Sequence, residues 1–175
     1  IDYAHTPDAL HEVLKSLRGT YENNISLVFG CGGERDIKKR PLMANIAKSF
    51  CKKIYVTDDN PRKENPAKIR GDIIKNLREC TYYNIGDRSQ AIKKALSNAE
   101  MNEIILIAGK GHENYQDYGK KIISISDKEI VKKLNLKMNK IINKNQNFDF
   151  NKKILNQILK KKIFFKFDGL SIDSR

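Results

Sequence analysis

The chain has 175 residues, of which 39% are hydrophobic, and its net charge is +13. No run of apolar residues approaches the roughly 18–20 needed to cross a membrane, and the sequence contains no signal-peptide core. The charge invites a nucleic-acid interpretation, but residues 131–175 carry 12 lysines and arginines against 3 acids, which leaves residues 1–130 with only +4. We therefore interpret the excess as a solvated lysine-rich tail, with a basic nucleic-acid binder as the alternative.

The sequence starts at Ile1 rather than Met and stops at Arg175, so we expect a piece of a longer protein. Its three cysteines, Cys31, Cys51 and Cys80, are an odd number without metal-ligand spacing. Free cysteines favour a reducing environment, which predicts a cytoplasmic location.

Helices and strands are predicted to alternate over the first 135 residues. Helices are expected at 6–19, 41–50, 66–77, 88–99 and 127–134, and strands at 25–29, 53–57, 81–83, 103–108 and 121–125. Thr6 and Pro7 are typical of a helix start, and Gly19 of its end. Residues 103–108 are nearly all apolar, which predicts a central parallel strand. The alternation predicts an α/β fold, a Rossmann-like and mostly parallel sheet with helices on both faces.

Three segments follow from this pattern. Residues 1–135 form the predicted domain, and residues 136–150 are polar and rich in lysine and asparagine, as in a linker. Residues 151–175 are too few to bury a core, so we expect them to open a second domain.

The stretch from Thr57 to Arg62 follows the strand predicted at 53–57. In open α/β sheets, ligands bind at the carboxyl ends of the strands. Pro61 stiffens the backbone and holds Arg62, whose planar fork suits a carboxylate or a phosphate. An ordinary strand-to-helix loop, with Asp and Asn as turn residues, is the alternative.

Three turns, at 30–33, at 57–62 and at 109–113, follow predicted parallel strands and should share one edge of the sheet. This convergence predicts a common pocket. Gly30-x-Gly32-Gly33 is similar to part of a dinucleotide fingerprint, but the spacing of the third glycine fails. The sequence also lacks a Gly-x-x-x-x-Gly-Lys-Ser/Thr loop for a nucleoside triphosphate.

The predicted rim carries both signs of charge. Arg35, Arg62 and Lys110 supply positive charge, and Asp59 and Glu113 supply negative charge. Such a rim suits a zwitterion, with the ligand's carboxylate on an arginine and its ammonium on a carboxylate. For Arg35 and Lys110, solvated surface charge is the alternative. Capping and packing are the alternatives for the two nearby histidines, His5 and His112.

Five motifs occur in a recognisable order. They are DYAHTPDAL (2–10), FGCGGERD (29–36), RPLM (40–43), TDDNPR (57–62) and AGKGHE (108–113). Together they resemble the C-terminal domain of the Mur ligases, in particular the members that add diaminopimelate. The resemblance covers about residues 1–135.

The resemblance implies an ATP-dependent amide ligase of peptidoglycan synthesis that adds meso-diaminopimelate to UDP-MurNAc-L-Ala-D-Glu through an acyl phosphate. It implies that ATP and Mg²⁺ are bound mainly by domains missing from this chain. The chain alone would then be inactive, and the whole enzyme a monomer that binds no nucleic acid. Without the resemblance, a free-standing Rossmann-like nucleotide-binding module is the other interpretation.

The family's ligand contacts can be carried over by motif. The implied diaminopimelate contacts are Arg35, Asp59, Asn60, Pro61, Arg62, Gly109 and Glu113, and the implied nucleotide-facing residues are Asp2 and His5. No catalytic residue and no metal ligand is implied within this chain. Lysine-adding members of the family lack the arginine at Arg62, so we expect Arg62 to pair with the second carboxylate of diaminopimelate.

Residues 169–175 look like the start of a second Mur ligase, of the kind that adds D-alanyl-D-alanine. We therefore expect the parent protein to be a fusion of two successive Mur ligases, truncated on both sides. A chance match of seven residues after a disordered tail is the alternative.

Overall fold

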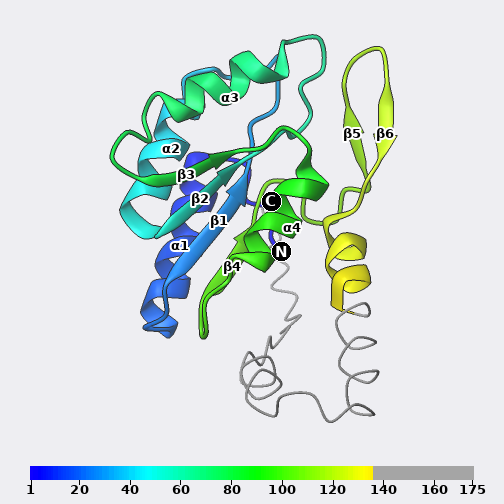
Figure 1. The fold of residues 1–175 in the computed structure, drawn as a ribbon. Coiled ribbons are helices and arrows are strands. Elements are labelled where there is room, and N and C mark those ends of the chain that lie inside the picture. Colours follow the sequence, from blue (N-terminus) through cyan, green and yellow to red (C-terminus); the bar gives the residue numbers. More distant parts are fainter. Residues whose placement is uncertain (136–175) are drawn as a thin grey trace, which may run out of the picture.

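A computed structural model, which describes residues 1–135, contains a four-stranded parallel sheet with helices on both faces (Figure 1). This arrangement confirms the predicted fold class. The predicted linker at 136–150 and the predicted second domain at 151–175 lie outside the described residues. Within the described part, every helix is too short or too polar to span a lipid bilayer.

The strands of the sheet lie in the order β3 (Thr81–Asn84), β2 (Lys53–Val56), β1 (Ile25–Phe29) and β4 (Ile104–Ile107), and all pairs are parallel. All five residues of β1 are buried, as expected for a strand between two neighbours.

The prediction that residues 103–108 form a central strand was wrong, because β4 lies at the edge of this sheet. Its apolar character is explained by what covers it. The N-terminal segment closes the carboxyl end of its open edge: Asp2 N–H donates to Ile107 O at 2.9 Å, and Gly109 N–H donates to Asp2 O at 3.2 Å. Apolar composition reports burial, and an edge strand with covered faces is buried too.

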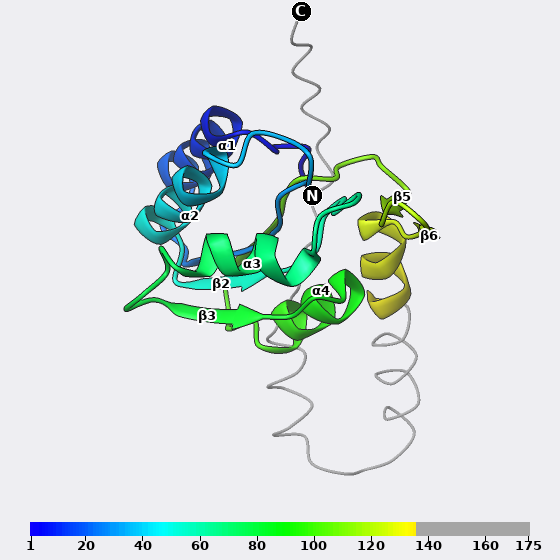
Figure 2. The same ribbon diagram turned by 90° about the horizontal axis from the view of Figure 1, so that it is seen from above.

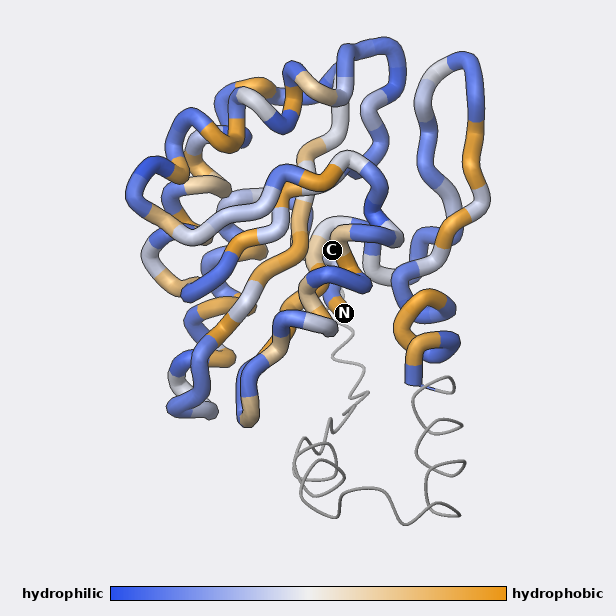
Figure 3. The backbone as a smooth tube through the Cα atoms, in the orientation of Figure 1, coloured by the Kyte–Doolittle hydropathy of each residue, from blue (hydrophilic) through white to orange (hydrophobic). Residues whose placement is uncertain are grey.

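Helices cover both faces of the sheet (Figure 2). On one face, α1 (Pro7–Thr20), α2 (Lys39–Phe50) and α3 (Pro66–Ile74) pack on a cluster that includes Leu27, Phe29 and Ile54. The other face carries α4 (Arg88–Ser97) and a helix over residues 127–135, which pack on Val28, Tyr55 and Ile107. Successive strand residues thus point to opposite faces, and Figure 3 shows hydrophobic residues concentrated along the strands.

Side-chain caps set the starts of α1, α3 and α4, whereas α2 begins without one. Thr6 Oγ1 accepts from Ala9 N–H at 3.3 Å, which confirms the predicted start of α1. Asn65 and Asp87 cap α3 and α4 in the same way. The prediction that Gly19 ends α1 was wrong: Gly19 lies inside the helix, which continues to Thr20.

A two-stranded antiparallel hairpin, β5 (Tyr115–Asp117) and β6 (Ile122–Ser124), stands apart from the parallel sheet. The strand predicted at 121–125 corresponds to β6, but its partner β5 was missed because three residues carry no readable alternation. Gln116 Nε2 anchors the hairpin by donating to the carbonyls of Asp58 at 2.9 Å and Asp59 at 2.8 Å.

A buried ion pair connects α4 with the helix over residues 127–135. The Arg88 guanidinium donates to both carboxylate oxygens of Asp127, at 2.8 and 2.7 Å, and both side chains are fully buried. Arg88 also donates to Ala108 O at 2.9 Å. The pair thereby connects α4, the end of β4 and the helix over residues 127–135.

We expect Asp127→Asn to lower the free energy of unfolding by about 3–5 kcal/mol, because Arg88 keeps its buried charge without a partner. The double variant Arg88→Met/Asp127→Leu should lose less, since it removes both charges. Urea unfolding measures both, with Glu12→Gln as a control, because the side chain of Glu12 is 69% exposed. Equal losses for the single and double variants would contradict this account.

Arg40 forms a second buried centre of charge. Its guanidinium donates to Glu64 at 2.8 Å and to Asp72 at 3.1 Å, and its side chain is 1% exposed. The hydrogen bond from Arg40 holds the pKa of Glu64 below its ordinary value. Burial alone would raise the pKa of Asp72, but the hydrogen bonds and charges of Arg40 and Lys75 together outweigh this effect and the pKa is lowered.

Carboxyl groups with lowered pKa values stabilise the fold above their ordinary pKa, and this stabilisation is lost as the pH falls through their lowered values. We therefore expect the free energy of unfolding to fall as the pH drops below 4.5, the ordinary value for Glu64. Arg40→Met should flatten this acid-side dependence as well as lower stability at pH 7. Lys48→Met is the matched control, because the carboxylate that Lys48 pairs with, Glu79, is exposed. If the free energy of unfolding of Arg40→Met fell with pH as steeply as that of the wild type, Arg40 would not be the cause of the lowered pKa values.

Candidate functional site

The turns that follow β1, β2 and β4 meet at one edge of the sheet, as predicted. These three strands are adjacent and parallel, so their carboxyl ends lie side by side. Backbone hydrogen bonds join two of the turns directly: Gly33 N–H donates to Asn60 O at 2.9 Å. Side chains join the third, because Asn60 Nδ2 donates to Glu113 Oε2 at 3.1 Å.

The glycines after β1 are required by the close approach of backbone. A Cβ on Gly33 would lie 1.9 Å from Pro61 O, and a Cβ on Gly30 would lie 2.2 Å from Thr57 O. Neither position can hold a side chain unless the two turns move apart. The glycine cluster therefore brings the two turns together, and its partial likeness to a dinucleotide fingerprint has this structural cause.

Arg62 has a left-handed backbone, with a φ of +53°. This conformation is uncommon for a residue with a side chain, and such residues cluster at functional sites. Its N–H donates to Asp117 O at 2.8 Å, and its Nη1 donates to Gly33 O at 2.7 Å. One edge of the guanidinium is thus fixed by backbone, and Nε and Nη2 have no partner among the described residues.

Asn60 and Lys110 form a network inside the site. Asn60 Oδ1 accepts from Lys110 Nζ at 3.1 Å and from Asp117 N–H at 3.0 Å. Lys110 Nζ also donates to Glu113 Oε2 at 2.7 Å. Because Lys110 is only 1% exposed, the prediction of a positive charge on the open rim was wrong for this residue, and so was solvated surface charge.

Asp59 has one carboxylate oxygen without a partner. Its Oδ1 accepts from Asn60 N–H at 2.7 Å, but Oδ2 is buried and accepts no hydrogen bond within residues 1–135. Gly109 faces it: with a φ of +107°, a Cβ there would lie 3.0 Å from Asp59 Oδ2. A buried anionic oxygen is costly without a donor, so this atom is suited to a ligand's ammonium group.

Arg35 and Pro61 complete the set of predicted contacts. Arg35 is exposed. Both arginines lie beside Gly32: a Cβ added to Gly32 would lie 3.9 Å from Arg35 Cγ and 3.0 Å from Arg62 Nη1. Pro61 is buried, with its carbonyl against Gly33. The structure therefore brings all seven predicted ligand contacts to the same edge of the sheet.

Asp2 and His5 lie beside the turn at 109–113. Asp2 bonds to the end of β4 through its backbone, and its Oδ1 accepts from Ala4 N–H at 2.7 Å. His5 Nδ1 lies 2.9 Å from Tyr3 O, and the Tyr3 ring lies 4.6 Å from the His5 ring and 5.2 Å from that of His112. The rings of Tyr3, His5 and His112 thus form a small cluster beside the turn at 109–113. The hydrogen bond of the His5 ring goes to Tyr3 O and not to Asp59 or Glu113.

Two groups at this edge, Glu113 and Tyr3, have pKa values that differ from their ordinary values. Burial alone would raise the pKa of Glu113, but hydrogen bonds from Lys110 and Asn60 outweigh it and the pKa is lowered. Burial raises the pKa of Tyr3, and the charges of Glu113 and Asp59 raise it further. Glu113 is therefore ionised at neutral pH and available to pair with a cation.

Sequence reasoning missed the residues that support the turn at 57–62. Arg70 from α3 pairs with Asp58, whose second oxygen accepts from Tyr118 OH at 2.9 Å. Burial, with the Asp58 charge beside it, raises the pKa of Tyr118. The motif TDDNPR indicated Asp58, but no local pattern could indicate partners that lie 12 and 60 positions away.

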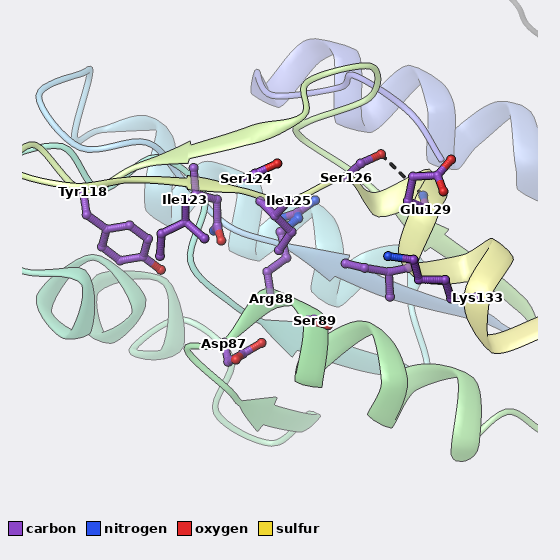
Figure 4. A pocket seen from close by; sticks show the side chains of 12 residues that line it. Asp87, Arg88, Ser89, Tyr118, Ile123, Ser124, Ile125, Ser126, Glu129 and Lys133 are labelled. Carbon is purple, nitrogen blue, oxygen red and sulfur yellow. Dashed lines mark hydrogen bonds between the residues drawn. The ribbon is translucent and has the colours of Figure 1, made fainter. Parts of the chain in front are cut away.

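A cavity of about 600 Å³ lies elsewhere, between the start of α4, the hairpin and the helix over residues 127–135 (Figure 4). It contains none of the predicted ligand contacts, and its charged lining is mixed, with Asp87, Arg88, Glu129 and Lys133. Arg88 is already paired with Asp127 inside the protein. The chemistry of this cavity therefore points to no ligand.

The described residues contain no group of three or more His, Cys, Asp or Glu side chains placed to hold a metal ion. Burial raises the pKa of Cys31 and of Cys51 to about 12, so neither thiol is a thiolate nucleophile at neutral pH. This edge of the sheet is therefore suited to binding a charged ligand by hydrogen bonds and ion pairs.

Comparison with known proteins found similar chains. The family model for the Mur ligase, glutamate ligase domain, matches residues 1–111. The UDP-N-acetylmuramoyl-L-alanyl-D-glutamate–2,6-diaminopimelate ligase of Rickettsia felis is 46% identical over 136 residues, which cover 77% of this chain and 26% of the relative. The enzyme of the same name from Haemophilus influenzae is 49% identical over 131 residues, covering 74% and 27%.

A solved structure of a ligase with that name is similar to this chain at a TM-score of 0.70, with 42% sequence identity. The match covers 75% of this chain and 27% of the solved one. The chain thus spans about a quarter of the length of the relatives that it matches.

We expect Gly33→Ala to lower the free energy of unfolding by about 1–3 kcal/mol or more, because its Cβ would force apart the turns after β1 and β2. The matched control is Gly71→Ala, since Gly71 lies in α3, where an added Cβ would meet no atom within 4 Å. That control should be neutral or stabilising, by up to about 1 kcal/mol. Urea unfolding compares them, and a tolerated Gly33→Ala would show that the turns are not in obligatory contact.

Proposed function

This chain belongs to the Mur ligase family, and from that premise we propose that it is the C-terminal part of a ligase of peptidoglycan synthesis. The whole enzyme would use ATP to add meso-diaminopimelate to UDP-MurNAc-L-Ala-D-Glu. The names of its relatives support this choice of substrates, which 46% identity makes reasonable to transfer. This chain would supply the amino-acid pocket and would be inactive alone.

In the proposed reaction, the free D-glutamyl carboxylate attacks the γ-phosphorus of ATP, giving an acyl phosphate and ADP. An amino group of diaminopimelate then attacks the acyl carbon. The tetrahedral intermediate expels phosphate and loses a proton, which leaves an amide. The residues of this chain would hold the diamino acid so that its amine meets the acyl phosphate, a positioning role.

One observation carries the proposal: the site contains cationic and anionic side chains that still have hydrogen-bonding positions open to a ligand. The guanidinium of Arg62 has donors that no described residue uses, next to the exposed Arg35. Across the site, Asp59 Oδ2 accepts from no donor in residues 1–135, and Glu113 is ionised. A molecule with a carboxylate at one end and an ammonium beside it would satisfy both sets at once.

The same geometry supports diaminopimelate over lysine. The two amino acids differ by a second carboxylate, which we propose Arg62 binds. Lysine would leave a partly desolvated guanidinium unpaired, so discrimination could reach roughly 10⁴-fold.

ATP and Mg²⁺ would be bound mainly by parts of the enzyme outside this chain, since residues 1–135 offer no cluster of metal ligands and the sequence no triphosphate loop. We propose that Asp2 and His5 face the nucleotide, because they lie beside the turn at 109–113. We further propose a monomeric enzyme in the cytoplasm.

The fusion with a second Mur ligase stays a prediction, because residues 169–175 lie outside the described residues. Sequencing the parent gene beyond Arg175 tests it. A stop codon at that point, or a downstream sequence without an ATP-loop glycine motif, would end the idea.

In the full-length parent enzyme, we expect Arg62→Ala to raise the KM for meso-diaminopimelate by roughly 10- to 150-fold, the equivalent of about 1.5–3 kcal/mol for a charge-assisted hydrogen bond. The KM for ATP should change less than about twofold, since the nucleotide binds elsewhere. Steady-state kinetics with each substrate varied in turn measures this. The exposed neighbour Lys63→Ala is the control, and equal losses for both substrates would contradict the assignment.

A further inference from the structure

We propose that Lys110 is a positioning residue: its buried ammonium holds Asn60 and Glu113 in the orientation that binds the amino group of the ligand. This inference rests on the proposed amino-acid pocket and adds to it a residue that touches no substrate. Lys110 would thus act on diaminopimelate only through its two partners.

The burial of Lys110 is the first reason. Its side chain is 1% exposed, and a lysine is almost never fully buried unless its charge is paired. Its Nζ lies 2.7 Å from Glu113 Oε2, 3.1 Å from Asn60 Oδ1 and 5.3 Å from the centre of the Tyr115 ring. An ammonium that is this enclosed has a defined position, so its two acceptors are defined as well.

Lys110 determines which way the Asn60 amide faces. Asn60 Oδ1 accepts from Lys110 and from Asp117 N–H, two donors that only an oxygen can receive. Asn60 Nδ2 must therefore point to Glu113 Oε2. Without the ammonium, one of the two donors that select this amide orientation is gone.

Lys110 also anchors the Glu113 carboxylate. Oε2 accepts from both Lys110 and Asn60, and the Tyr3 side chain also hydrogen-bonds to Glu113. The carboxylate is thus held in one orientation at the edge of the site. Burial raises the pKa of Glu113, and the hydrogen bond from Lys110 is the largest of the effects that together lower it.

Arginine would not replace lysine here. The site requires a compact cation that reaches an amide oxygen and a carboxylate oxygen over an aromatic face, whereas a guanidinium is a wide planar fork.

The test uses the full-length ligase with Lys110→Met, which keeps the length of the side chain and removes its charge. We expect the KM for meso-diaminopimelate to rise about 10- to 100-fold, while the KM values for ATP and the UDP-linked substrate change less than about twofold. Lys120→Met, on the exposed loop of the hairpin, is the matched control and should leave all three unchanged.

A pH profile separates positioning from general loss of structure. Removing Lys110 leaves burial to raise the pKa of Glu113, so the acid limb of kcat/KM for diaminopimelate should move to higher pH. The titratable groups that act on Glu113 are Lys110 and His112, and Tyr3 hydrogen-bonds to it; Asp59 and Tyr115 act on Tyr3, and Tyr115 also lies under Lys110. His112→Asn is therefore included, and it should leave the shift in Lys110→Met intact.

The double variant Lys110→Met/Glu113→Gln guards against failure to fold, because it leaves no unpaired charge. In that background the acid limb assigned to Glu113 should be absent, and the KM effects of the two single changes should not multiply. An unshifted acid limb in Lys110→Met, or fully multiplicative effects, would overturn the positioning role. A wild-type enzyme that does not use diaminopimelate would instead overturn the proposed function.

Discussion

The contact between the turns after β1 and β2 is the constraint on which the rest of this edge depends. Gly33 meets Pro61 so closely that no side chain fits between them, and Arg62 Nη1 then bonds to Gly33 O at 2.7 Å. Parallel pairing of β1 and β2 places both turns at the same level, and the glycines allow them to touch. The guanidinium of Arg62 is thereby oriented by backbone, which positions it more rigidly than a surface side chain.

Charge at this edge is divided between internal and ligand-directed groups. Lys110 donates its hydrogen bonds to Glu113 and Asn60. Asp58 pairs with Arg70 and accepts from Tyr118. These internal contacts stabilise the turns. Arg62 Nε and Nη2 and Asp59 Oδ2 keep hydrogen-bonding capacity that no described residue uses, and Glu113 is ionised. A site with free groups of both signs on a fully bonded support is suited to recognising a zwitterion with little rearrangement.

The cavity near α4 illustrates why size alone does not identify a site. It is lined by isoleucines and by an arginine whose charge Asp127 already neutralises. The edge with the carboxylates, in contrast, has unsatisfied polar capacity at Asp59 Oδ2 and at Arg62. The described residues span about a quarter of the length of the relatives that this chain matches.

The sequence by itself determined the helices, most strands and the meeting of the three turns, because periodicity, caps and parallel topology are local signals that combine simply. It also determined the candidate residues, since Asp59, Arg62 and Glu113 lie in compact motifs. Only the tertiary structure decided that β4 is an edge strand, that β5 pairs with β6, and that Lys110 is buried rather than exposed. Strand order and the burial of a charge depend on which distant groups surround them, and Asn60, 50 positions from Lys110, is a partner that no local pattern encodes.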